Sequence, residues 1–218
     1  DIFYFTGYTG SDSVVLLSAK KKKGWLITDS RYTEEAENSA PEMETEIWRA
    51  GFGIYTGKRI KKLGMKKIGY TPGTLTVSFF NAMKTEATSG AKWTDIGAEI
   101  GNFRAVKSAG EIALMQAALT CAEESFLAAK KRWRIGMTEV EVKNDLEWEM
   151  RRRGAQDTAF EMIVAVDANA SLLHAHAGKR TLTGGKMQLI DFCAQLNRYN
   201  FDLTRKTWIG EMTKVLAK

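Results

Sequence analysis

The chain has 218 residues, of which 44% are hydrophobic and 27% charged, a composition that excludes fibrous, collagen-like and wholly disordered proteins. The formal net charge is +6, but the basic residues are spread along the chain, so they do not indicate a nucleic-acid partner. No apolar run approaches the roughly 18–20 residues of a membrane-spanning helix, and we therefore expect no membrane association.

The cysteines and the two ends of the sequence bear on where the protein works. Cys121 and Cys193 lie in different segments without a paired spacing, which favours a reducing, cytoplasmic location over a disulfide framework. The sequence begins with Asp1 in a segment that lacks the features of a secretory signal. It ends with EMTKVLAK, which carries no turn or cap signal. We therefore expect a chain truncated at both ends.

Up to residue 103, short runs typical of strands alternate with runs typical of helices, which predicts an α/β domain with a mixed sheet. The predicted strands are Ser13–Leu17, Gly24–Thr28, Glu44–Trp48, Lys67–Tyr70 and Lys92–Ile96. The predicted helices are Thr56–Leu63 and Thr76–Thr88. We interpret Ser18–Lys23 as a hairpin loop whose four lysines are solvated. The glycine-rich segment Gly51–Gly57 lacks the spacing of a nucleotide-binding loop and is interpreted as a turn.

The pattern changes near Arg104, where we place the boundary between a domain of residues 1–103 and one of residues 104–218. Ser108 with Glu111, and Thr138 with Glu141, have the spacing of capping boxes and so predict two helix starts. The first helix has apolar residues at three- and four-residue steps, at Ile112, Met115, Leu119, Ala122, Phe126 and Ala129. The second has the stripe Val142, Leu146 and Met150 and is predicted to end at Gly154. The predicted strands Phe160–Val166, Lys186–Ala194 and Tyr199–Ile209, with a turn at Gly184-Gly185, complete an α+β domain.

Two aspartates in the last predicted hairpin are candidate metal ligands. If Leu196-Asn197 form a two-residue turn, Asp191 and Asp202 become direct cross-strand neighbours with β-carbons about 4.5–5.5 Å apart. Like charges at that distance require a proton or a cation between them, and carboxylate oxygens suit hard divalent ions. The alternative is a hairpin in another register, with two separately solvated aspartates.

The only two histidines of the sequence, His174 and His176, lie in the segment LLHAHAG. In an extended segment their spacing of two places both imidazoles on one face, where they can bind a metal or a substrate carboxylate. The alternative is a pair of loop histidines that bond to the backbone. One H-x-H motif does not decide between these interpretations.

The order of several segments resembles the Xaa-Pro aminopeptidase and Xaa-Pro dipeptidase (prolidase) family over nearly the whole chain. These segments include FTGYTGSDSVVLLS, GWLITDSRYTEEAE, IGYTPGTLT, RAVKSAGEIALMQAALTCAEESF, GMTEVEV, AFEMIVAVDANASLLHAHAG and LIDFCAQLNRYNFDLTR. The resemblance implies a creatinase-type α/β N-terminal domain followed by the first half of a "pita-bread" α+β catalytic domain. It also implies hydrolysis of the bond before proline, proline-containing peptides as substrates, and a homodimer.

Residue roles follow from the same resemblance. Asp191 and Asp202 match the first two metal-ligand aspartates of the family, whose complete members hold two divalent ions, commonly Mn²⁺, Co²⁺ or Zn²⁺. His174 matches the histidine that contacts the substrate near the scissile bond and is the expected catalytic residue, and His176 is expected to contact substrate as well. The family completes its metal site with a histidine and two glutamates that are not in this sequence, so we expect the chain alone to be inactive and to bind weakly or not at all to metal.

Several positions depart from the family pattern. Asp167 and Arg198 stand where glycine is usual, and Leu173 stands where proline is usual. Other departures are Cys193, Phe201 and Lys206, in place of glycine, a small residue and threonine. Arg198 is costly if it is the second residue of a type I′ turn, which needs positive φ. Lys206 shares the strand parity of Asp202, so its ammonium could neutralise the aspartate pair in place of metal.

Two other classes of function stay open at this point. The fold implied by the resemblance also occurs in non-catalytic modules that bind peptides or histones. It occurs in a metal-free amidinohydrolase of the creatinase type as well, although both metal-site aspartates are kept here, which argues against that interpretation.

Overall fold

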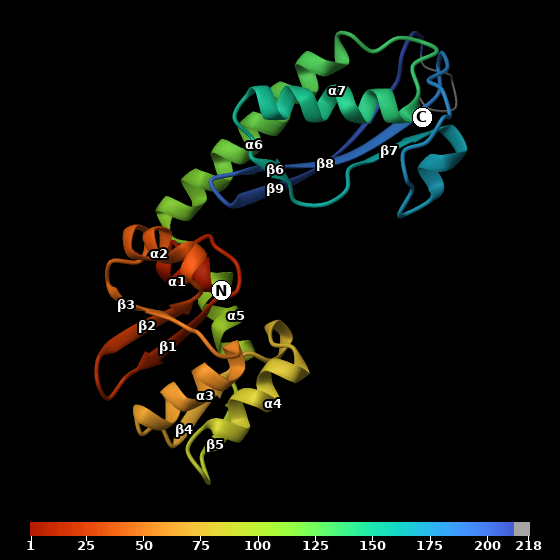
Figure 1. Cartoon of the computed structure of the whole chain (residues 1–218). Coiled ribbons are helices and arrows are strands. Elements are labelled where there is room, and N and C mark those ends of the chain that lie inside the picture. The colour runs from red at the N-terminus through yellow and green to blue at the C-terminus, as the bar shows by residue number, and fades with distance from the viewer. Residues whose placement is uncertain (212–218) are drawn as a thin grey trace. The chain divides into compact units, whose positions relative to one another are not determined.

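The computed structural model describes residues 1–211, which form two compact units, Asp1–Val106 and Lys107 onward (Figure 1). The C-terminal segment of residues 212–218, which includes most of EMTKVLAK, lies outside the described residues. Each unit has its own hydrophobic clusters and its own sheets.

The first unit is α/β, as predicted. Its strands are β1 (Val14–Ser18), β2 (Lys23–Thr28), β3 (Met43–Ile47), β4 (Lys67–Tyr70) and β5 (Lys92–Asp95). Its helices are α1 (Ile2–Thr6), α2 (Thr33–Ser39), α3 (Phe52–Lys62), α4 (Val77–Glu86) and α5 (Gly97–Ala105), with short 3₁₀ turns η1 (Ser30–Tyr32) and η2 (Pro72–Thr74). β1 pairs antiparallel with β2 across the predicted lysine loop, and β2 pairs parallel with β3, so this sheet is mixed. β4 and β5 form a separate parallel pair.

The prediction of a turn over Gly51–Gly57 is wrong. Gly51 precedes α3 with φ +76°, but Gly53 and Gly57 lie inside this helix and are buried. A β-carbon on Gly53 would lie 2.8 Å from the Phe79 carbonyl oxygen of α4, and one on Gly57 would overlap the Met83 carbonyl oxygen. The two glycines therefore allow α3 and α4 to approach closely, and this tertiary gain outweighs their low helix propensity.

The second unit is α+β. It contains α6 (Ala109–Lys130), α7 (Glu139–Arg152), β6 (Asp157–Thr158), β7 (Ile163–Val166), the 3₁₀ turn η3 (Asp167–Ser171), β8 (Gln188–Leu196) and β9 (Tyr199–Thr207). The four strands form one antiparallel sheet in which β8 pairs with β6, β7 and β9. Both predicted capping boxes are confirmed, at Ser108–Glu111 and Thr138–Glu141, and Gly154 has φ +98° after α7.

Helices α6 and α7 lie on one side of this sheet and cover one of its faces (Figure 1). The core between them contains Leu146 of α7 and a stack of Phe126 on Phe192, with ring centroids 5.5 Å apart. By length and composition alone α6 is apolar enough to cross a membrane, contrary to the expectation from the sequence. One of its faces, with Ala122, Phe126 and Ala129, packs in the core of the second unit.

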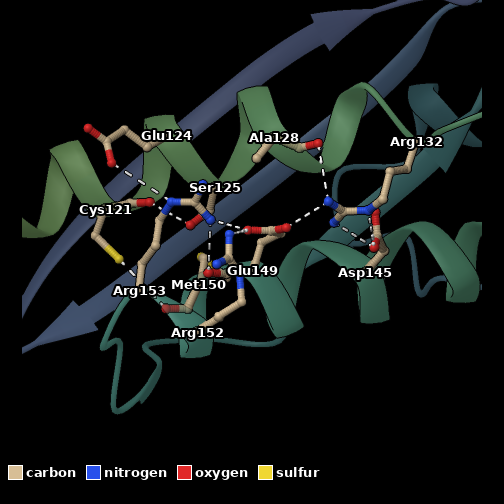
Figure 2. A network of polar contacts seen from close by, with 10 residues as sticks. All are labelled: Cys121, Glu124, Ser125, Ala128, Arg132, Asp145, Glu149, Met150, Arg152 and Arg153. Atoms are coloured by element: carbon tan, nitrogen blue, oxygen red, sulfur yellow. Dashed lines mark hydrogen bonds and ion pairs between the residues drawn. The ribbon is translucent and has the colours of Figure 1, made fainter.

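A network of charged side chains surrounds the C-terminal end of α7 (Figure 2). Glu149 is 1% exposed and accepts hydrogen bonds from three guanidinium groups, of Arg132, Arg152 and Arg153. Burial by itself would raise the pKa of Glu149, but these hydrogen bonds outweigh it and lower the pKa to about 2. Asp145 accepts from Arg132 at 2.7 Å in the same network, which ties the loop after α6 to α7.

The β8–β9 hairpin has a different register from the predicted one. The two turn residues are Asn197 and Arg198, with φ of +50° and +66°, rather than Leu196-Asn197. Positive φ at both positions is the requirement of a type I′ turn, whose twist matches that of the strands. Moving the turn by one residue shifts the pairing by two, so that Asp191 faces Thr204 and Asp202 faces Cys193.

Candidate active site: a histidine–aspartate cavity

The candidate catalytic, metal-ligating and substrate-binding residues of the sequence analysis line one cavity of about 410 Å³ in the second unit. We call it the His–Asp cavity. It is lined by Phe160, Glu161, Ile163, Leu173, His174, Ala175, His176, Asp191 and Asp202. The aspartates come from β8 and β9, and the histidines come from the loop that follows η3. The structure thus brings together side chains from segments that are separate in the sequence.

The two aspartates are diagonal neighbours rather than the directly opposed pair that the sequence predicted. A shift of two residues preserves the parity of a strand, so both carboxylates still project from the same face of the hairpin. Partial burial raises the pKa of Asp202 above its ordinary value, and the charge of the nearby Asp191 carboxylate raises it further. The Thr204 hydroxyl donates a hydrogen bond of 2.8 Å to Asp191 Oδ1.

The two histidines project from one loop with their side chains exposed. Ala175 between them is buried, with 5% of its surface exposed, so the loop turns its two imidazoles outward and its alanine inward. His176 Nδ1 lies 3.3 Å from Glu161 Oε2, and the Lys143 ammonium donates to Glu161 Oε1 at 2.9 Å. Lys143, and to a smaller extent His176, lower the pKa of Glu161. This carboxylate therefore stays ionised beside His176.

Lys206 lies on the same face of the hairpin as Asp202, as its strand parity predicted. It is exposed and pairs with Leu189 across the hairpin, two positions beyond the Asp191–Thr204 pair. Within residues 1–211 no ion pair joins its ammonium to Asp191 or Asp202, and burial together with the Asp191 carboxylate raises the pKa of Asp202. Neutralisation of the aspartate pair by Lys206 therefore stays a prediction.

The aspartates fit part of a metal site. Two adjacent carboxylates are a donor set that hard divalent cations prefer, and a cation between them would relieve the repulsion that raises the pKa of Asp202. In the part of the chain that the structure describes, no three side chains of His, Cys, Asp or Glu converge on one point. The described residues therefore offer two carboxylates to such a site.

Two departures from the family pattern lie at left-handed backbone positions. Asp167 has φ +52° at the start of η3, and Arg198 has φ +66° in the hairpin turn. Glycine adopts this conformation without strain, which explains why a glycine is usual there. Asp167 tolerates it better than most residues, and its carboxylate pairs with the Lys186 ammonium at 3.3 Å.

Sequence reasoning missed Glu161 and Thr204 as members of the site. Nothing local marks Glu161, which reaches the cavity because of how its loop packs. Thr204 could have been found, because placing the turn by the positive φ required at Arg198 would have paired it with Asp191.

A larger cavity, of about 850 Å³, lies in the first unit and contains none of the predicted site residues. Its carboxylates, Asp12 and Asp29, are both paired with Arg31 at 3.0 and 2.7 Å. Both of its carboxylates are thus engaged by one guanidinium group, and its lining contains no histidine or cysteine.

Comparison with family models matches a different model to each unit. Residues 113–218 match the model of metallopeptidase family M24, and residues 1–106 match that of the creatinase/prolidase N-terminal domain. The chain thus combines a creatinase/prolidase N-terminal domain with part of an M24 peptidase domain. Its architecture is a creatinase-type α/β domain followed by part of a pita-bread peptidase domain.

Individual peptidases match along nearly the whole chain. An uncharacterized peptidase of Bacillus subtilis, YqhT, is 29% identical over 218 residues, covering 100% of this chain and 61% of its own length. The structure of an X-Pro aminopeptidase from Thermotoga maritima is 33% identical with a TM-score of 0.89, and that of an Xaa-Pro dipeptidase from Bacillus anthracis is 31% identical with a TM-score of 0.91. Each covers 99% of this chain, which spans 60% of either protein.

Proposed function

We propose that the His–Asp cavity binds peptides at the bond that precedes proline, and that its two aspartates contribute to a dinuclear metal centre of an Xaa-Pro peptidase. The observation that carries this proposal is the meeting of His174, His176, Asp191 and Asp202 around one cavity. The names of the relatives, Xaa-Pro dipeptidase and X-Pro aminopeptidase, support the choice of substrate.

The roles of the residues follow from their chemistry. Asp191 and Asp202 would hold divalent cations such as Mn²⁺, Co²⁺ or Zn²⁺, which supply a bound water of lowered pKa as nucleophile. Thr204 keeps the Asp191 carboxylate oriented through its hydrogen bond. His174, exposed in the cavity, donates an N–H to a substrate oxygen next to the scissile bond. Glu161 holds the His176 imidazole beside the cavity, where a ring N–H can bond to a peptide carboxylate.

A second candidate is a module that binds proline-containing peptides without cleaving them. The observation in its favour is that the described residues supply two carboxylate ligands and no convergent third ligand. For the 218-residue chain by itself we expect this behaviour, because two carboxylates do not hold two metals in the coordination that water activation requires.

The test combines binding and turnover on the purified 218-residue chain. Isothermal titration with Ala-Pro, with and without Mn²⁺, should show binding that is weakened at least about tenfold in Asp191→Asn and Asp202→Asn. Asp157→Asn, an exposed aspartate of β6 that pairs with Arg151, is the matched control and should bind as the wild type does. The same samples should release no alanine.

Three outcomes separate the candidates. Turnover that follows the protein through purification and disappears in Asp191→Asn would assign hydrolysis to this chain alone. Binding without turnover supports the proposed cavity and the non-catalytic behaviour of this chain. Absence of binding to both Ala-Pro and Mn²⁺ would overturn the proposed function.

A further inference from the structure

The loop that carries the two histidines is attached at both of its ends to one buried carboxylate, that of Glu139. Glu139 is the first residue of α7 and has 0% of its surface exposed. Its Oε1 accepts hydrogen bonds from the Val166 backbone N–H at 2.9 Å and from Asn169 Nδ2 at 3.1 Å, where β7 enters η3. Its Oε2 accepts from the Gly178 backbone N–H at 2.9 Å, just after His176.

This carboxylate is balanced without a cation. Among the described residues no cation forms an ion pair with Glu139. Burial of a carboxylate without an ion pair or hydrogen bonds would destabilise the fold by several kcal/mol. Instead of a cation, two backbone N–H groups and the Asn169 side-chain amide donate hydrogen bonds to the carboxylate. The dipole of α7, whose positive end is at Glu139, adds a favourable interaction. Loss of any of these donors would leave the buried carboxylate of Glu139 poorly satisfied, so the position of this side chain and that of the donor segments depend on each other.

The backbone around Glu139 strengthens the same attachment. The Glu139 N–H donates to the Arg180 carbonyl at 2.9 Å, and the Val140 N–H donates to the Gly178 carbonyl at 3.2 Å. A β-carbon on Gly178 would lie 3.5 Å from Glu139 Oε2, so this residue sits directly against the carboxylate. Both ends of the segment from Val166 to Gly178 are thus fastened to the first turn of α7.

We propose that Glu139 is a positioning residue for the His–Asp cavity: by hydrogen-bonding to both ends of this loop, its side chain places His174 and His176 opposite Asp191 and Asp202. Glu139 does not line the cavity and acts only through the loop. The effect on peptide binding rests on the proposed function, whereas the effect on the histidines does not.

Glu139→Gln tests this proposal because it keeps the size of the side chain and replaces one acceptor oxygen with an NH₂ group. That group would face a backbone N–H or the Asn169 amide, and one donor would lose its partner. The matched control is Glu141→Gln, two residues further along the same helix. Glu141 is exposed, bonds only to Thr138, and Gln can still close the capping box.

Two readouts on the 218-residue chain are independent of activity. Amide hydrogen exchange at Val166 and Gly178 should become at least about tenfold faster in Glu139→Gln and stay unchanged in Glu141→Gln. Because the sequence has two histidines, NMR of the imidazole protons gives one signal for each. Both signals should move in Glu139→Gln toward their positions in the urea-unfolded chain, and neither should move in the control.

Asn169→Ala keeps the test usable if Glu139→Gln does not fold. It removes the side-chain donor to Glu139 Oε1 and should shift the imidazole signals in the same direction by a smaller amount, with Ser171→Ala in the same 3₁₀ turn as its control. Imidazole signals that stay in place in both Glu139→Gln and Asn169→Ala would overturn the positioning role, even if stability falls.

Titration with Ala-Pro separates this inference from the proposed function. If the wild type does not bind Ala-Pro but the imidazole signals depend on Glu139, the proposed function fails and the positioning role stands. If the wild type binds and Glu139→Gln binds equally well, the positioning role is overturned while the proposed function stands.

Discussion

The two ends of α7 each bury a glutamate, and they stabilise it in opposite ways. At the N-terminal end, Glu139 is surrounded by N–H donors and has no cation among the described residues. At the C-terminal end, Glu149 is surrounded by three guanidinium groups (Figure 2). Both residues are at most 1% exposed.

The helix dipole explains the difference. A carboxylate at the N-terminus of a helix interacts favourably with the unpaired N–H groups there, whereas one in the last turn meets the negative end of the dipole. Glu149 is therefore stabilised by cations, whereas Glu139 accepts its hydrogen bonds from the segment that carries the two histidines. In this helix the buried carboxylate near the N-terminus organises a loop, whereas the one near the C-terminus holds α6 and α7 together.

The largest effect is expected from truncating the N-terminal carboxylate. Glu139→Ala leaves the Val166 and Gly178 N–H groups buried without acceptors and opens a cavity, so the free energy of unfolding should fall by about 3–5 kcal/mol. Urea unfolding followed by circular dichroism measures it. Glu141→Ala, which disturbs only an exposed cap, should cost about 1 kcal/mol or less. Equal losses in the two variants would remove the distinction between the buried and the exposed glutamate.

A smaller loss is expected at the other end of the helix. Glu149→Gln removes the charge that three arginines share, but these arginines are partly exposed and can be solvated, so the loss should be about 2–3 kcal/mol. Glu147→Gln, which breaks a more exposed pair with Arg151 on the same helix, is the control and should cost about 0.5 kcal/mol. A Glu149→Gln loss as small as that of the control would contradict the role of the network.

The acid stability of the chain should report on Glu149. Its pKa is about 2 in the folded protein, against an ordinary value of 4.5, so its ionised form stabilises the fold above about pH 4.5. This contribution is lost as the pH falls from 4.5 toward 2. The difference in unfolding free energy between wild type and Glu149→Gln should therefore shrink over this range, and a difference that stays constant would show that Glu149 is not held ionised by its arginines.

Salt should affect the two ends differently. The Glu149 network includes exposed guanidinium groups that ions can screen, so between about 0.05 and 1 M NaCl its loss on mutation to Gln should shrink by about 0.5–1 kcal/mol. The loss caused by Glu139→Gln, which involves buried N–H groups, should not change. A salt dependence of equal size at both ends would break the comparison.

The smallest effect is the coupling between the ends. Glu139 and Glu149 are ten residues apart on α7, about 15 Å along the axis, and share no hydrogen-bond partner. The losses of the two Gln substitutions should therefore add to within about 0.3–0.5 kcal/mol in the double variant. A larger coupling, measured in the same urea titrations, would show that α7 transmits strain between its ends.

Features that depend on residues close together in the chain were predictable from the sequence. The capping boxes at Ser108 and Thr138 were predictable because each is closed by residues three positions apart. The common face of Asp191 and Asp202 was predictable because strand parity survives an even shift of register. The family resemblance likewise rests on the linear order of segments, and the family models confirm it.

Only the tertiary structure decided what depends on contacts between distant segments. Gly53 and Gly57 form a helix because α4 packs against them, and Glu139 is a buried acceptor because the loop around His174 closes over it. A local sequence pattern does not predict this helix or this buried carboxylate. Both are stabilised by burial and by hydrogen bonds between segments that are far apart in the sequence. The turn at Asn197-Arg198 lies between these cases, because its positive φ was a local signal while its place in the hairpin was decided by pairing along the whole of β8 and β9.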